Sequence, residues 1–201
     1  MKSFLTMTSP PITAMIRLDH SHVLAAFRRY HPNSPKWRKR SIVESACIAL
    51  EIHAQLEDEI LYPALSRVAP DNDVLHKSEP EHNQMRETIR SLRNMDVNHP
   101  DYDSCFMQLI RETLHHVADE ETVLLPLAER QLQSELQTLG ASMTRRRIEL
   151  LCERPMQVVT HTVLTFPLAS AVVAGVAACA MGHLLCGGRV SGCAPRTAGR
   201  R

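Results

Sequence analysis

The chain has 201 residues, which is enough for one domain and an additional segment. Its 23 basic and 22 acidic residues give a formal net charge of +1, so no overall positive field would draw it to nucleic acid, and we expect no nucleic-acid partner. Aromatic residues make up 4% of the sequence and β-branched runs are short, which argues against a sheet-based core. The six cysteines include no C-x-x-C pair, so zinc-ribbon and thioredoxin-like motifs are excluded.

Residues 1–11 are a short N-terminal lead without the apolar stretch of a secretory signal peptide. We therefore expect a cytoplasmic protein, in which the cysteines of the main body are buried thiols rather than disulfides. A helical pattern begins directly after the two prolines that end this lead.

Residues 12–133 contain four long helical patterns. In the first of them, Ile16, Val23 and Phe27 recur at helical spacing. Breaks that contain Pro, Asn and Asp separate the patterns, which begin near residues 12, 35, 73 and 102. Four long helices with short connections predict an all-α, up-down-up-down four-helix bundle. We expect Pro63 to kink the second helix or to end its regular part.

The character of the sequence changes after residue 133. Residues 134–156 predict a basic connecting helix, residues 157–188 an apolar C-terminal helix, and residues 189–201 a flexible basic tail that carries the last of the cysteines. From Phe166 to Cys186 there are 21 residues without Asp, Glu, Lys or Arg, a length that can span a bilayer. Basic residues flank this segment on both sides, so the positive-inside rule does not settle its orientation. We favour a membrane anchor on the inner face over a helix packed on the bundle or on another subunit, because the bundle already has four helices.

One phrase occurs twice in the predicted bundle, as "IHAQLEDEILYPAL" at 52–65 and as "HHVADEETVLLPLAE" at 115–129. In each copy a His is followed four residues later by a Glu, and six residues after that by a Pro. Residues four apart share one face of a helix, so each pair offers an imidazole and a carboxylate, which is half of a transition-metal site. The two copies are His53, Glu57, Pro63 and His116, Glu120, Pro126.

The repeat extends upstream of both phrases. His20 lies 33 residues before His53, and His82 lies 34 residues before His116. The chain therefore reads as two similar helix hairpins, and together they supply four imidazoles and two carboxylates, a set that suits two iron or manganese ions and leaves room for a small ligand. A single His-x3-Glu is usually a solvated pair, but two copies that enter apolar stretches and have matched upstream His residues favour a metal site.

The pattern resembles the hemerythrin-like, or HHE cation-binding, family over about residues 12–132. The resemblance rests on the two phrases and on "LDHSHV" and "EHNQMRETI". It implies a bundle that encloses a non-haem di-iron centre with oxo and carboxylate bridges. It also implies metal-ligand roles, with Glu57 and Glu120 as the bridges, for His20, His53, Glu57, His82, His116 and Glu120.

From this resemblance we expect a protein that binds O2, NO or peroxide in sensing, detoxification or iron-centre maintenance. Enzymatic turnover stays open, because the same centre could reduce NO or remove peroxide with an unidentified redox partner. A third alternative is a helical interaction module without metal, in which the His residues only fill the core.

The sequence departs from the oxygen carriers of this family in its third helix. Those proteins place two His residues one turn apart there, whereas the residue one turn before His82 is Ser78, and His76 lies on another face. Simple reversible oxygen storage is therefore disfavoured, and the pattern is closer to relatives linked to nitric oxide response and repair of iron–sulfur centres. We interpret His115, beside His116, as a flanking residue or as an outer partner of the metal ligands.

Four acidic residues lie directly beside the predicted ligand positions. They are candidates to accept hydrogen bonds from the outer imidazole nitrogens, although solvated acids on a helix surface are an equal alternative. These residues are Asp19, Asp58, Glu81 and Glu121.

Overall fold

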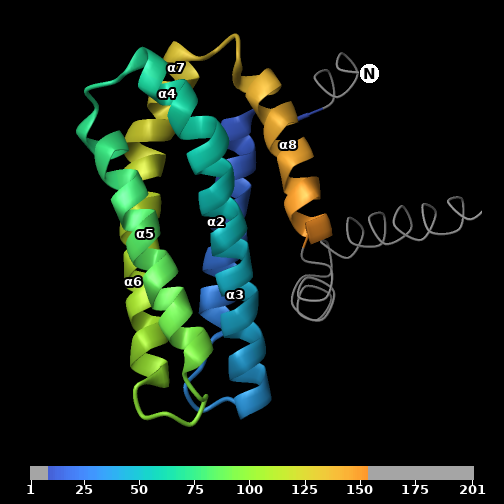
Figure 1. The fold of residues 1–201 in the computed structure, drawn as a ribbon, viewed down its shortest axis with the longest axis vertical. Coiled ribbons are helices and arrows are strands. Elements are labelled where there is room, and N and C mark those ends of the chain that lie inside the picture. The colour runs from blue at the N-terminus through green and yellow to red at the C-terminus, as the bar shows by residue number, and fades with distance from the viewer. Residues whose placement is uncertain (1–8, 154–201) are drawn as a thin grey trace, which may run out of the picture.

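The computed structural model describes residues 9–153, and all of its regular structure in that range is helical (Figure 1). Two helices, α3 and α6, each continue through a five-residue π-helical turn (η1 and η2) into a short helix. The predicted four-helix bundle is confirmed, and its parts are α2 (Ile12–Arg29), α3 (Lys36–Leu56), η1 (Glu57–Leu61), α4 (Tyr62–Val68), α5 (Asp73–Asn94), α6 (Tyr102–Asp119), η2 (Glu120–Leu124) and α7 (Leu125–Gln131).

A further helix, α8 (Leu136–Glu153), runs along the outside of the bundle and packs against α2 and α3 (Figure 1). It falls in the segment for which a basic connecting helix is predicted. The predicted apolar helix at 157–188 and the tail at 189–201 lie outside the described residues, as does most of the N-terminal lead. Among residues 9–153, no helix combines the length and the apolar character needed to cross a membrane.

Prolines and one side-chain cap define the ends of the long helices. Pro11 and Pro35 occupy the positions just before α2 and α3, where a missing N–H costs no helical hydrogen bond. The carboxamide oxygen of Asn72 accepts a hydrogen bond from the N–H of Leu75 at 3.0 Å and so caps α5. The short connections that result keep consecutive helices antiparallel and adjacent.

The two π-helical turns occupy equivalent places in the two hairpins. The N–H of Tyr62 bonds the carbonyl of Glu57, and the N–H of Leu125 bonds the carbonyl of Glu120, each five residues back. A proline in mid-helix would lack an N–H and crowd the carbonyl four residues earlier. After the wide turn, Pro63 instead becomes the second residue of a new helical segment. The regular α-helix therefore ends before Pro63, as predicted, but the chain continues in helical form.

The interior consists of two apolar clusters with a polar layer between them. One cluster, which includes Ile16 and Leu56, lies toward the end of the bundle where α4, α7 and α8 meet. The other, which includes Val23 and Phe106, lies toward the opposite end. Along α2 the sequence passes from Ile16 in the first cluster through His20 to Val23 in the second. The layer at His20 is thus sealed by apolar side chains on both sides.

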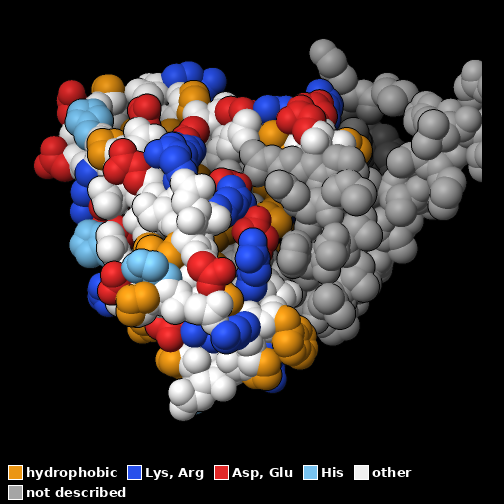
Figure 2. Space-filling model, turned by 60° about the horizontal axis from the view of Figure 1, so that its bottom comes forward, with side chains coloured by type: hydrophobic (Ala, Val, Ile, Leu, Met, Phe, Trp, Pro, Cys, Tyr) orange, Lys and Arg blue, Asp and Glu red, His pale blue; other side chains and the backbone are white. Residues whose placement is uncertain are grey.

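The surface carries charges of both signs. Lys and Arg side chains alternate with Asp and Glu on the face shown in Figure 2. Ion pairs between helices include those of Arg93 with Glu44 and Glu51. Exposed pairs of this kind contribute little stability individually, and their mixture agrees with the near-zero net charge of the chain.

Candidate metal centre

The structure brings all six sequence-predicted side chains into the polar layer. None of them is more than 4% exposed to solvent. They come from six elements, because α2, α3, α5 and α6 each provide a His and the two π-helical turns each begin with a Glu. The residues are His20, His53, Glu57, His82, His116 and Glu120.

The six side chains form two groups that share a carboxylate. In the first, His20 Nε2 lies 3.1 Å from Glu120 Oε2, and His53 Nε2 lies 3.2 Å from Glu57 Oε2. Potential ligand atoms of these four residues all lie within 4.8 Å of one another.

The second group consists of Glu57, His82 and His116, and its ligand atoms meet the same limit of 4.8 Å. The Nε2 atoms of the two His residues are 3.0 Å apart, and that of His82 lies 3.4 Å from Glu57 Oε2. Glu120 Oε2 approaches this group as well, at 3.5 Å from His116 Nε2. Both carboxylates therefore lie between the two pairs of imidazoles.

The donor set fits divalent transition-metal ions. Both carboxylate oxygens of Glu57 and both ring nitrogens of His53 are buried without a hydrogen-bond partner. Buried polar atoms of this kind are costly unless something satisfies them. Imidazole nitrogens and carboxylate oxygens are suitable ligands for iron, manganese and zinc. Cations at the two positions would satisfy the carboxylate oxygens of Glu57 and the inward Nε2 atom of His53.

Each imidazole turns its Nδ1 atom outward, toward a carboxylate from a different helical segment. The distances are 2.8 Å from His20 to Glu121, 3.6 Å from His53 to Asp19, 2.8 Å from His82 to Asp58 and 2.9 Å from His116 to Glu81. A carboxylate at Nδ1 fixes the ring orientation and directs the unprotonated Nε2 inward. The four acids that flank the predicted ligands therefore contact imidazoles, and they are not merely solvated.

The repeat in the sequence explains this regularity. Each acid is the chain neighbour of an inward-facing residue, as Asp19 is of His20 and Glu121 is of Glu120. Consecutive helical residues are rotated by about 100°, so an acid beside an inward residue points toward the next helix. The arginines that pair with these acids do not follow the repeat. Arg17 pairs with Glu121 and Arg86 pairs with Asp58, but the two arginines lie at different positions relative to the ligand His residue of their own helix.

The carboxylates and imidazoles shift one another's pKa values. Burial alone would raise the pKa of Glu57, but the surrounding imidazoles of His53, His116 and His82 hold it well below its usual range. Burial alone would lower the pKa of His116, but the carboxylates of Glu57 and Glu81 raise it to about 10. Without metal, the site therefore favours an ionised Glu57 and a protonated His116, and a cation can replace the proton of that imidazole.

Tyr62 belongs to this site, although sequence reasoning missed it. Its hydroxyl donates a hydrogen bond to Glu120 Oε1 at 2.9 Å and lies 3.4 Å from His82 Nε2. In a regular α-helix, a residue five places after Glu57 would point well away from it. The π-helical turn adds a residue to that turn and brings Tyr62 onto the inward face. A proline closely following a His-x3-Glu is the one signal that could have suggested such a turn.

The neighbouring His residues lie outside the buried layer. His115 is strongly exposed on the outer face of α6, near Glu81 and Asp119, which agrees with its interpretation as a flanking residue. Lys77 already pairs with Asp119 there. His76 is exposed and bonds the carbonyl of Pro70, so it does not reach the site.

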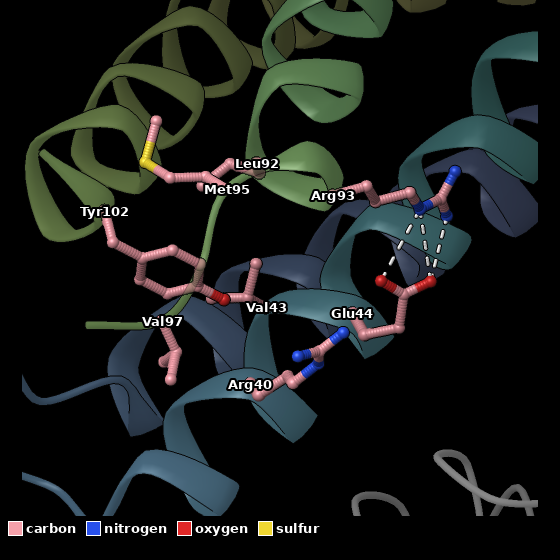
Figure 3. Close-up of a pocket in the computed structure, with 8 residues that line it drawn as sticks. All are labelled: Arg40, Val43, Glu44, Leu92, Arg93, Met95, Val97 and Tyr102. Atoms are coloured by element: carbon pink, nitrogen blue, oxygen red, sulfur yellow. Dashed lines mark hydrogen bonds and ion pairs between the residues drawn. The ribbon is translucent and has the colours of Figure 1, made fainter. Parts of the chain in front are cut away.

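A separate pocket lies where α3 begins and α5 ends, away from the buried layer (Figure 3). It has a volume of about 350 Å³, and its lining includes the apolar side chains of Val43 and Leu92 and the paired side chains of Arg93 and Glu44. None of the six predicted ligands lines it. The chemistry suggested by the sequence therefore does not involve this pocket.

Comparison with known proteins agrees with this geometry. The family model of the hemerythrin HHE cation binding domain matches residues 12–137. A solved structure of a hemerythrin HHE cation binding domain-containing protein from Mycobacterium kansasii has a similar fold, with a TM-score of 0.63 and 20% sequence identity, and the match covers 75% of this chain and 93% of that one. A DNA nickase of Nostoc sp. is 23% identical over 124 residues, which are 62% of this chain and 35% of the nickase. This chain thus spans about a third of that relative's length.

Proposed function

Since this chain belongs to the hemerythrin HHE cation-binding domain family, we propose that it is a non-haem di-iron protein that binds a small ligand, namely O2, NO or peroxide. The observation that carries the proposal is the buried layer of four imidazoles and two carboxylates, in which Glu57 and His53 have no other partner. Manganese is the alternative metal for the same donors.

The protein side chains hold and tune such a centre in three ways. The outer carboxylates, among them Glu81 and Asp58, accept from Nδ1 and keep Nε2 free to bind metal. The apolar clusters on both sides exclude water from the layer. Tyr62 donates a hydrogen bond to Glu120 inside the site and so helps to fix the position of this carboxylate. Bound iron would supply electrons and an open coordination position for the small ligand.

The proposal is tested by anaerobic loading of the purified chain with Fe²⁺, followed by exposure to O2 and, separately, to NO. We expect two irons per chain and a change in the optical spectrum with at least one of these ligands. His53→Ala should lose iron, whereas His31→Ala, at an exposed loop position, should retain it. Retention of less than one iron per wild-type chain, or full retention by His53→Ala, would contradict the proposal.

The same experiment separates ligand binding from catalysis. A reversible spectrum with O2 supports a carrier or sensor, and a stable nitrosyl spectrum supports a role in nitric oxide response. Repeated consumption of NO or peroxide with a chemical reductant would assign an oxidoreductase. We do not extend the nickase activity to this chain, because about two thirds of that relative lie outside the match.

A further inference from the structure

Helix α8 contacts an outer carboxylate of the candidate metal centre through Arg147. Met143 and Leu150 of α8 are buried in the same apolar cluster as Ile16 of α2. Arg147 lies between them on the same face of α8, at spacings of four and three residues. Its guanidinium forms two hydrogen bonds with the carboxylate of Asp19, one of them 3.0 Å long.

Asp19 is the outer carboxylate that faces His53, and it differs from the other three. Its Oδ2 atom lies 3.6 Å from Nδ1 of His53, which is too long for a hydrogen bond. The other three imidazoles have carboxylates at 2.8 to 2.9 Å from Nδ1. The same Oδ2 atom of Asp19 is in close contact with Arg147.

The arginine that pairs with Asp19 also comes from a different part of the chain than the arginines that pair with the other outer carboxylates. Arg17 and Arg86, which hold the carboxylates facing His20 and His82, belong to bundle helices α2 and α5. Arg147 belongs to a helix that lies almost entirely beyond residue 137, where the family match ends. The pair is well shielded, since Asp19 is 16% and Arg147 is 26% exposed.

We propose that Arg147 is a positioning residue that holds Asp19 away from His53, so that α8 sets the donor strength of one of the four imidazoles. A carboxylate hydrogen-bonded to Nδ1 makes an imidazole a stronger metal ligand. A bidentate guanidinium fixes the carboxylate and neutralises its charge, which weakens that effect. His53 is therefore a weaker metal ligand than the other three His residues, and the two metal positions differ in their affinity for metal. This inference rests on the proposed di-metal function.

The test measures the affinity of the full-length chain for Co²⁺, by competition with a chelator, together with the ligand-field spectrum. In Arg147→Ala, Asp19 is free to close on His53. We expect one of the two Co²⁺ ions to bind about tenfold more tightly, at the lower end of the effects seen for outer partners of metal ligands, and its absorption bands to shift. Arg147→Lys keeps the charge without the bidentate geometry and should lie in between.

Two further variants separate positioning from general damage to α8. Arg146→Ala is the matched control, because Arg146 is the chain neighbour of Arg147 and pairs with Glu59 on the surface; it should bind Co²⁺ like the wild type. Asp19→Asn removes the group through which Arg147 acts, so adding Arg147→Ala to it should cause no further change. Weaker or unchanged binding in Arg147→Ala, or a full Arg147 effect in the Asp19→Asn background, would overturn the inference.

A measurement without metal keeps the inference distinct from the proposed function. In NMR spectra of the metal-free chain, Arg147→Ala should shift the ring nitrogen signals of His53 more than those of His20, His82 and His116, and Arg146→Ala should not. A wild-type chain that binds no Co²⁺ would contradict the proposed function, and the His53 signals would then decide the role of Arg147. Unshifted His53 signals would overturn that role.

Discussion

The hydroxyl of Tyr62 donates a 2.9 Å hydrogen bond to Glu120, across the interface between the two hairpins of the bundle. Burial and the two carboxylates raise the pKa of Tyr62 well above its usual value, so the phenol keeps its proton and remains a donor. At the equivalent position of the second hairpin, the residue is Leu125. The internal repeat is thus broken at the site itself, because one half supplies a polar group where the other supplies an apolar one.

Tyr62→Phe should leave Glu120 Oε1 without its donor. We expect the metal-free protein to lose about 1–3 kcal/mol of unfolding free energy, the cost of an unsatisfied buried polar group, and the iron-loaded protein to show a shifted optical spectrum. Urea unfolding and absorption spectroscopy measure the two effects. Tyr30→Phe is the control, because Asp103, which accepts from Tyr30, keeps its pairing with Lys39. Equal behaviour of the two variants would exclude a role for Tyr62 at the site.

Glu57→Gln should abolish binding at both metal positions, because Glu57 belongs to both groups of ligand atoms. The substitution preserves the shape of the side chain and removes its charge. We expect fewer than one metal ion per chain, measured by elemental analysis after Fe²⁺ or Co²⁺ loading. Glu59→Gln, two residues away on the exposed side of η1, should keep two ions. Retention of two ions by Glu57→Gln would rule out this carboxylate as the shared ligand.

Metal binding should release protons. Burial alone would lower the pKa values of His20 and His82, but their contacts with the buried carboxylates and with Glu121 and Asp58 raise them, and that of His116 rises to about 10. At pH 7 the metal-free site therefore holds protons that compete with metal, and affinity should rise with pH by about tenfold per unit for each proton released. Calorimetric Co²⁺ titrations in buffers of different ionisation enthalpy count these protons. A heat independent of the buffer would contradict this expectation.

Phe106→Ala should destabilise the cluster on the side of the site away from α8. Phe106 is fully buried and contacts the rings of Phe27 and Tyr30. Replacing such a side chain by Ala costs about 3–5 kcal/mol, which chemical denaturation would report. Its neighbour Met107 is 42% exposed, and Met107→Ala should change stability by less than about 0.5 kcal/mol. A loss below about 1 kcal/mol for Phe106→Ala would show that the cluster repacks around the missing ring.

Gly140→Ala should weaken the attachment of α8. A Cβ atom at Gly140 would lie 2.0 Å from the backbone oxygen of Pro10 and 3.2 Å from the N atom of Ile12, so the two segments would have to separate. Overpacking of this kind costs about 1–3 kcal/mol, measured as a loss of unfolding free energy. Ser142→Ala, at an exposed position of the same helix, is the control and should not destabilise. Unchanged stability in Gly140→Ala would mean that α8 can move without cost.

The sequence by itself determined the helices, the bundle and the set of inward-facing residues. Helical spacing of apolar residues, such as Ile16 and Val23, is a local property of the chain. The two His-x3-Glu phrases are also local, because residues four apart share a helix face in any packing. The acids beside the predicted ligands were visible in the sequence, but a solvated acid and one that supports an imidazole have the same local pattern.

Only the tertiary structure decided which side chains meet across helices. The contact of Tyr62 with Glu120 depends on the register shift at η1, which no regular helical period predicts. The contact of Arg147 with Asp19 joins residues 128 positions apart, and it exists because Met143 and Leu150 dock α8 beside α2. Such contacts arise from packing between segments that carry no local sequence signal for one another. For that reason the sequence predicted which residues face inward, whereas the fold decided which partners adjust their chemistry.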